Sequence, residues 1–208
     1  MAVGVVGVVF GVLARASGLS VEKACAMSLL VFTGASQLAA VSVIAAGGTA
    51  IAAVASAMLL AVRNALYGPV VAHWFGRDSL PTRLAVTQVI IDESAGVGAA
   101  QPDPTDARRG FLAAGLGVYV CWNLGTLVGA LAGDLVGDPT RWGLDAAFPA
   151  AFVALLAPHV TNRPGRVAAI VAAAVTVATA PWLPAGAPIL IAAAVAVPVA
   201  VRSWEGPA

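Results

Sequence analysis

The longest uncharged stretch of this sequence runs from residue 24 to residue 62, 39 positions without Asp, Glu, Lys or Arg. As an α-helix it would be roughly 58 Å long, enough to cross a ~30 Å bilayer core twice. Charged residues make up only 10% of the chain, whereas soluble domains have roughly 25%. The sequence therefore predicts an all-α integral membrane protein. A net charge of +1 gives no basic surface for nucleic acid.

Glycines, prolines and charges divide the chain into helices. Paired glycines at residues 46–49 predict a turn that splits the long stretch. Residues 110–133 and 146–162 each predict one span, and residues 167–201 predict two short spans around the Pro-rich residues 181–188. Residues 1–14 are too short for a full span, and we expect a first helix whose beginning is missing from this chain.

Residues 84–100 differ from these spans, because only eight uncharged residues precede Asp92. We expect a short broken or re-entrant helix that is buried in protein and does not cross the membrane. The loops then carry nine basic residues on one side, which predicts seven crossings, a cytoplasmic C-terminus and a single polytopic domain over residues 1–208. The nine are Arg15, Lys23, Arg77, Arg83, Arg108, Arg109, Arg163, Arg166 and Arg202.

Polar residues interrupt the second predicted helix at residues 32–37 (FTGASQ). Gly34 weakens the helix, and Thr33 and Gln37 share one helical face because they are four residues apart. A helix unwound here would expose backbone groups to a ligand, so Thr33, Gly34, Ser36 and Gln37 are candidate substrate-binding residues. The alternative is that these small and polar side chains only pack helix against helix.

Arg63, Asn64 and Tyr67 follow in the third predicted helix. Arg63 lies about 11 residues, or ~16 Å, before Trp74 at the predicted helix end, which places it near the middle of the membrane. A buried arginine needs an anionic partner, either an acidic side chain or a substrate carboxylate. We therefore interpret Arg63, Asn64 and Tyr67 as substrate-binding residues.

Asp92 and Glu93 lie in the short polar segment, and Gln88 shares a helical face with Asp92. The two acids point about 100° apart, so one could partner Arg63 while the other faces solvent. Carboxylates inside membranes commonly relay protons, which makes both candidate proton-coupling residues. The alternative is a pair of ordinary solvated acids in an interfacial loop.

The next segments carry packing residues rather than a site. Gly125 and Gly129 have the spacing of a close helix contact, we expect Trp122 and Thr126 to pack beside them, and Pro149 is expected to kink its helix. Spacings typical of metal ligands, nucleotide-binding loops or hydrolase nucleophiles are absent from the sequence. We therefore expect no enzyme activity, no cofactor and no metal.

Five of these segments resemble motifs of the AzlC family. Residues 32–37 resemble its FxGaxQ segment, residues 63–68 (RNALYG) its R-H/N-x-L-Y segment, and Asp92 and Glu93 its DE motif. Residues 122–129 (WNLGTLVG) resemble W-x-x-G-T-x-x-G, and residues 148–152 (FPAAF) resemble P-A-x-F. Order and spacing also match over residues 4–159, although the family normally begins some residues earlier.

The resemblance implies a multi-pass exporter of branched-chain amino acids in the bacterial cytoplasmic membrane that works with a small hydrophobic AzlD-like membrane subunit. We therefore expect a secondary transporter for leucine, isoleucine and valine or other hydrophobic amino acids. Two other classes remain open. One is a non-transporting scaffold or permease subunit whose partner binds the substrate, and the other is an intramembrane enzyme.

Overall fold

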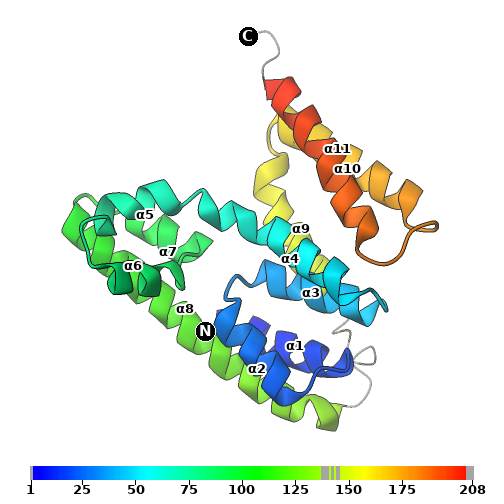
Figure 1. Ribbon diagram of the computed structural model, residues 1–208, viewed down its shortest axis with the longest axis horizontal. Coiled ribbons are helices and arrows are strands. Elements are labelled where there is room, and N and C mark those ends of the chain that lie inside the picture. Colours follow the sequence, from blue (N-terminus) through cyan, green and yellow to red (C-terminus); the bar gives the residue numbers. More distant parts are fainter. Residues whose placement is uncertain (1, 137–140, 142, 144–145, 205–208) are drawn as a thin grey trace.

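The computed structural model describes residues 2–136, 141, 143 and 146–204. Within these residues the chain is helical and has no β-strand (Figure 1). The helices are α1 (Ala2–Ala16), α2 (Val21–Leu30), α3 (Ala35–Ala45), α4 (Ala50–Ala65), α5 (Gly68–Phe75), α6 (Leu80–Thr87), α7 (Asp92–Ala99), α8 (Pro104–Val136), α9 (Ala147–Leu156), the 3-10 helix η3 (Ala157–Val160), α10 (Arg163–Thr179) and α11 (Ala187–Trp204). The all-α class is confirmed.

Helix α8 is the longest helix, and α1, α2, α5 and α7 pack on it. Helices α10 and α11 form a pair away from α8, and α11 contacts α4 (Figure 1). The α8 segment Pro104–Gly133 is, among the described residues, the one unbroken helix long and apolar enough to cross a membrane. Helices α4 and α5, which meet at a 49° bend, would together make a second.

Helix α1 packs along the second half of α8 and runs in the same direction. Gly4 lies against Cys121 of α8, and Arg15 lies against Gly133. The contact is close because glycines meet on both helices, and a Cβ added to Gly129 would collide with the backbone of Val8. Small residues that allow such an approach are the usual basis of helix association in membranes.

Helices α2 and α3 form a hairpin instead of the single crossing expected here. The backbone leaves the helix over residues 31–34, where Gly34 has a φ of +61°, a conformation that residues with a Cβ rarely adopt. Both arms run from this break toward the Val136 end of α8 (Figure 1). The buried hydroxyl of Ser28 in α2 donates to Thr126 Oγ1 of α8 at 3.1 Å. The prediction that Thr33 and Gln37 share one helical face was wrong, since the break separates them.

Helices α6 and α7 form a second hairpin, which enters from the opposite end of α8. At its base, Arg108 of α8 binds Asp78 in the loop before α6, with nitrogen–oxygen distances of 2.9 and 2.7 Å. At its tip, Val89 and Ser94 lie against Gly115. A broken helix over residues 84–100 was predicted, but Gln88 and Asp92 do not share a helical face, because the break lies between them.

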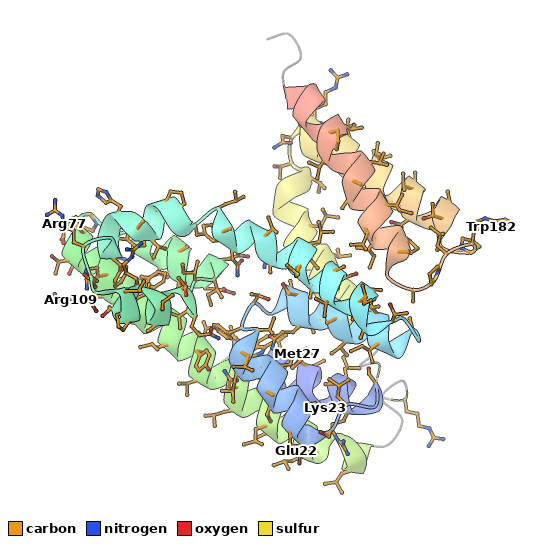
Figure 2. All side chains as sticks on the ribbon, viewed as in Figure 1. Glu22, Lys23, Met27, Arg77, Arg109 and Trp182 are labelled. Carbon is orange, nitrogen blue, oxygen red and sulfur yellow. The ribbon has the colours of Figure 1, made fainter. Side chains whose placement is uncertain are left out.

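The hairpins change the expected distribution of basic residues. Figure 2 shows Arg77 and Arg109 near one end of α8, and Glu22 and Lys23 near the other. Arg15 lies at the second end, beside Gly133. The prediction that nine basic residues share one side was therefore wrong for Arg15 and Lys23. The physical reason is that the α2–α3 segment returns to the end of α8 from which it started.

The turn predicted at residues 46–49 is confirmed, since α3 ends at Ala45 and Gly47 turns with a φ of +76°. The loop predicted at residues 181–188 also lies where expected, between α10 and α11. The span expected over residues 146–162 is the ten-residue helix α9 followed by η3. Pro149 is exposed in the first turn of α9, where its missing N–H breaks no helical hydrogen bond, so it does not kink the helix.

Candidate functional site

The tips of the two hairpins meet beside the middle of α8. Gln88 Nε2 of the second tip donates to the carbonyl oxygen of Leu29 at 2.7 Å, and Tyr119 of α8 donates to the same oxygen at 3.1 Å. Asn64, near the end of α4, donates to the carbonyl oxygen of Ile90 at 3.1 Å. Carbonyl groups released by the helix breaks thus receive hydrogen bonds from side chains of other elements, as buried backbone groups require.

Each break is also closed by a side chain of the helix that follows it. Gln37 accepts from the amide of Gly34 at 3.3 Å and donates to the carbonyl of Met27 at 3.1 Å. Ser94 accepts from the amide of Ile91 at 3.1 Å and donates to the carbonyl of Val89 at 2.7 Å. Gln37 is fully buried, so it holds the first tip in shape and does not face a ligand.

Asp92, the first residue of α7, binds side chains from the bend between α4 and α5. Arg63 Nη1 lies 3.1 Å from Asp92 Oδ2, and Tyr67 donates its hydroxyl hydrogen to Asp92 Oδ1 at 2.9 Å. The side chains of Arg63 and Asp92 are 33% and 35% exposed in the isolated chain. The neighbouring Glu93 is exposed. The carboxylate near Arg63 is thus supplied by the protein itself.

A cavity of about 360 Å³ lies beside this ion pair, within the ~300–1,000 Å³ range of small-molecule sites. Residues of both hairpin tips and of α4 supply its polar groups: Thr33, Gly34, Arg63, Asn64, Asp92 and Glu93. The remaining wall is largely apolar, with Val3, Val6, Phe32, Leu38, Val118 and Trp122. A second cavity of about 410 Å³ shares Phe32, Thr33 and Asn64 with the first, so these residues stand between the two spaces.

Three polar atoms on residues that line the first cavity are buried without a hydrogen-bond partner among the described residues. They are Thr33 Oγ1, Asn64 Oδ1 and Trp122 Nε1. A buried polar atom without a partner costs about 1–3 kcal/mol. The set comprises a donor at Trp122, an acceptor at Asn64 and a hydroxyl at Thr33 that can do either.

The structure places the residues singled out in the sequence in three groups. Thr33, Gly34, Arg63, Asn64, Asp92 and Glu93 border the first cavity, and Tyr67 reaches it through Asp92. Ser36 and Gln37 are buried behind the first tip. Gly125 and Thr126 lie in the contacts of α8 with α1 and α2, as Gly129 does.

Sequence reasoning missed the cavity-facing position of Trp122, which was assigned to packing only. Its ring does pack on Phe10, with centroids 5.9 Å apart, but the same side chain lines the cavity. Hydropathy could not have shown this, since the direction of an indole N–H is not encoded in the spacing. No group of His, Cys, Asp and Glu side chains suited to a metal occurs in the described part of the chain.

Two short helix pairs meet at a polar centre beside the long apolar helix α8, which together with the low charge content indicates a helical membrane protein. The model of the family described as "AzlC protein" matches residues 1–136, which include both hairpins and α8. The chain therefore belongs to the AzlC family. It is 32% identical over 201 residues to an "Uncharacterized membrane protein" of Archaeoglobus fulgidus, an alignment that covers 95% of this chain and 86% of the relative. No solved structure matches the chain.

Proposed function

We propose that this protein is a secondary transporter that exports hydrophobic amino acids, with leucine, isoleucine and valine as leading substrates, across the cytoplasmic membrane. The observation that carries the proposal is the Arg63–Asp92 ion pair at the meeting point of two re-entrant hairpins, beside a cavity with an apolar wall. Broken helices that meet near the middle of the membrane are typical of substrate sites in secondary transporters.

The cavity suits a small zwitterion with an apolar side chain. Its polar border offers charges of both signs and unpaired hydrogen-bonding atoms, which complement an α-amino and an α-carboxylate group. Its apolar wall complements an aliphatic side chain, whose transfer from water is favourable by ~25 cal/mol per Å². Ions alone would gain nothing from that wall.

The second cavity supports transport rather than simple binding. Phe32, Thr33 and Asn64 separate the two spaces. The Gln88 hydrogen bond to Leu29 joins the two hairpin tips, and the Asn64 hydrogen bond to Ile90 joins α4 to the second tip. If the tips part, a substrate in the first cavity can pass to the second. Asp92 and Glu93 lie where a passing substrate meets the second tip, so we assign proton coupling to them.

We further propose that the protein works with a small hydrophobic AzlD-like subunit in the membrane. A second candidate function is a non-transporting permease subunit whose partner binds the substrate. The two differ in what Arg63→Gln does. Transport by this chain predicts lost flux with the complex intact, whereas a scaffold predicts intact flux and weaker assembly.

The direct test is efflux of labelled leucine from proteoliposomes that contain the chain together with the small partner subunit. We expect efflux above that of protein-free liposomes and a rate that changes when a pH gradient is imposed. Arg63→Gln should abolish efflux, while Arg83→Gln, at an exposed position of α6, should not. Absence of flux for leucine, isoleucine and valine with the partner present would overturn the proposed substrates.

A further inference from the structure

The amino-terminal ends of α3 and α7 both border the first cavity, but they differ in charge. Helix α7 begins with Asp92 and Glu93, which supply negative charge to its own positive end. Helix α3 has no acidic residue in its first turn, although Gly34 and Ala35 line the cavity. The first turn of α3 therefore supplies no carboxylate to the positive end of its own helix.

Trp122 provides a second, independent observation at the same place. Its side chain is 5% exposed, its indole N–H has no acceptor, and it lines the same cavity. The edge of its ring, at Cη2, lies 3.8 Å from the position that a Cβ on Gly34 would take. An indole nitrogen only donates hydrogen bonds, so the group that satisfies it must be an acceptor.

We propose that the amino-terminal end of α3 and the indole N–H of Trp122 together bind the carboxylate of the substrate, while Arg63 stays paired with Asp92. This inference rests on the proposed function and names a different carboxylate partner from the one that the sequence suggests. Helix termini that point at anionic groups and donors that converge with them are an established solution for anion binding.

The occupancy of Arg63 favours this assignment. Asp92 already uses one carboxylate oxygen for Arg63 and the other for Tyr67. A substrate carboxylate on the other nitrogens of Arg63 would place a second anion beside Asp92 in the same small space. At the end of α3 the Gly34 amide already donates to Gln37 Oε1, so the substrate carboxylate binds the amides that follow it. The amino group of the substrate remains free for the unpaired oxygens of Thr33 and Asn64.

The test separates the two ends of the substrate with three probes: leucine, 4-methylpentanoate, which lacks the amino group, and 3-methylbutylamine, which lacks the carboxylate. Binding of each is measured by calorimetry on the full chain with its partner subunit in nanodiscs. Trp122→Phe keeps an aromatic ring and removes the N–H. Trp74→Phe is the matched control, because Trp74 packs on Phe111 and lines neither cavity.

We expect Trp122→Phe to weaken leucine and 4-methylpentanoate at least tenfold, as for a lost hydrogen bond to a charged group. The affinity of Trp122→Phe for 3-methylbutylamine should stay within twofold of wild type. The affinities of Trp74→Phe for all three probes should do the same. A measurement that needs no change at Trp122 is the ¹⁵N-indole spectrum of the wild type. There the Trp122 N–H resonance should move with the two carboxylate probes and not with the amine.

Leucine binding that Trp122→Phe leaves unchanged, or that falls together with amine binding, would overturn the carboxylate site and leave the proposed function standing. Binding of 4-methylpentanoate through Trp122 with no binding of any hydrophobic amino acid would overturn the proposed function and leave the carboxylate site. If the wild type binds none of the three probes, both are wrong.

Discussion

Arg63 Nη1 of α4 lies 3.1 Å from Asp92 Oδ2 of α7, and this ion pair joins the bend after α4 to the tip of the second hairpin. Each side chain is about one-third exposed in the isolated chain. Water therefore cannot fully solvate either charge if its partner is removed. The pair therefore holds these two parts of the proposed transport path together.

The first prediction is that the two charges are interdependent. Arg63→Gln and Asp92→Asn should each lower the free energy of unfolding by about 1–2 kcal/mol, because each leaves one unpaired charge in a partly buried place. The double variant should lose less than the sum of the two. Thermal unfolding in detergent, followed by intrinsic fluorescence, measures this, with Arg83→Gln as the control. Strictly additive losses would show that the pair carries no coupling.

Much of the fold is readable from the sequence because helix ends in a membrane need turn residues. Paired glycines mark the turn after α3, and prolines mark the loop between α10 and α11. Whether an uncharged segment continues in one direction or turns back cannot be predicted in the same way. An uncharged stretch as long as residues 24–46 has the same hydropathy whether it crosses or returns, and only Gly34, with its φ of +61°, reverses it. Charge counting over loops then fails for Arg15 and Lys23.

The site shows the same limit. Arg63, Asn64 and Asp92 stand out because ionisable and amide groups are costly in a membrane, so the sequence singles them out without a structure. The choice of partner for Arg63 stayed open between a side chain and a substrate, since spacing along the chain does not give distances between α4 and α7. Trp122 was read as packing only, because an aromatic residue on a helix face rich in glycine usually packs.

The second prediction concerns the hydrogen bond from Gln88 to Leu29, which links the two tips. Gln88→Leu should let the tips part more often, by about fivefold if the bond contributes ~1 kcal/mol. A cysteine at Thr33, between the two cavities, reports this as a faster reaction with a small thiol reagent in a background without Cys25 and Cys121. Gln101→Leu is the control, because the Gln101 side-chain amide donates to the nearby carbonyl of Val97 in α7 and not to a hairpin tip. Equal labelling rates would exclude Gln88 as a restraint on the tips.

The third prediction uses two glycines of α8 that differ in surroundings. A Cβ on Gly129 would collide with the Val8 backbone, so Gly129→Ala should separate α1 from α8 and cost about 1–3 kcal/mol. Gly117 has nothing within 4 Å, and Gly117→Ala should instead stabilise the helix by about 0.5–1 kcal/mol. Unfolding midpoints should move in opposite directions. A shift of the same sign and size in both would mean that α1 does not pack closely on α8.

The last prediction is a pH dependence at the base of the second hairpin. Hydrogen bonds from the Arg108 guanidinium hold the pKa of the Asp78 carboxyl below its usual range, against a smaller opposing effect of desolvation. A carboxyl whose pKa is lower in the folded state stabilises the fold above its unfolded pKa of ~3.9, and the effect is lost as the pH falls through the folded value. The unfolding midpoint of wild type should therefore exceed that of Asp78→Asn at pH 7, and the gap should close as the pH falls below ~3.9. Asp106→Asn is the control, since its 3.4 Å pair with Arg109 lies at the surface. If the difference between the two unfolding midpoints does not change with pH, the Asp78→Asn substitution destabilises the loop for a reason other than the lost charge.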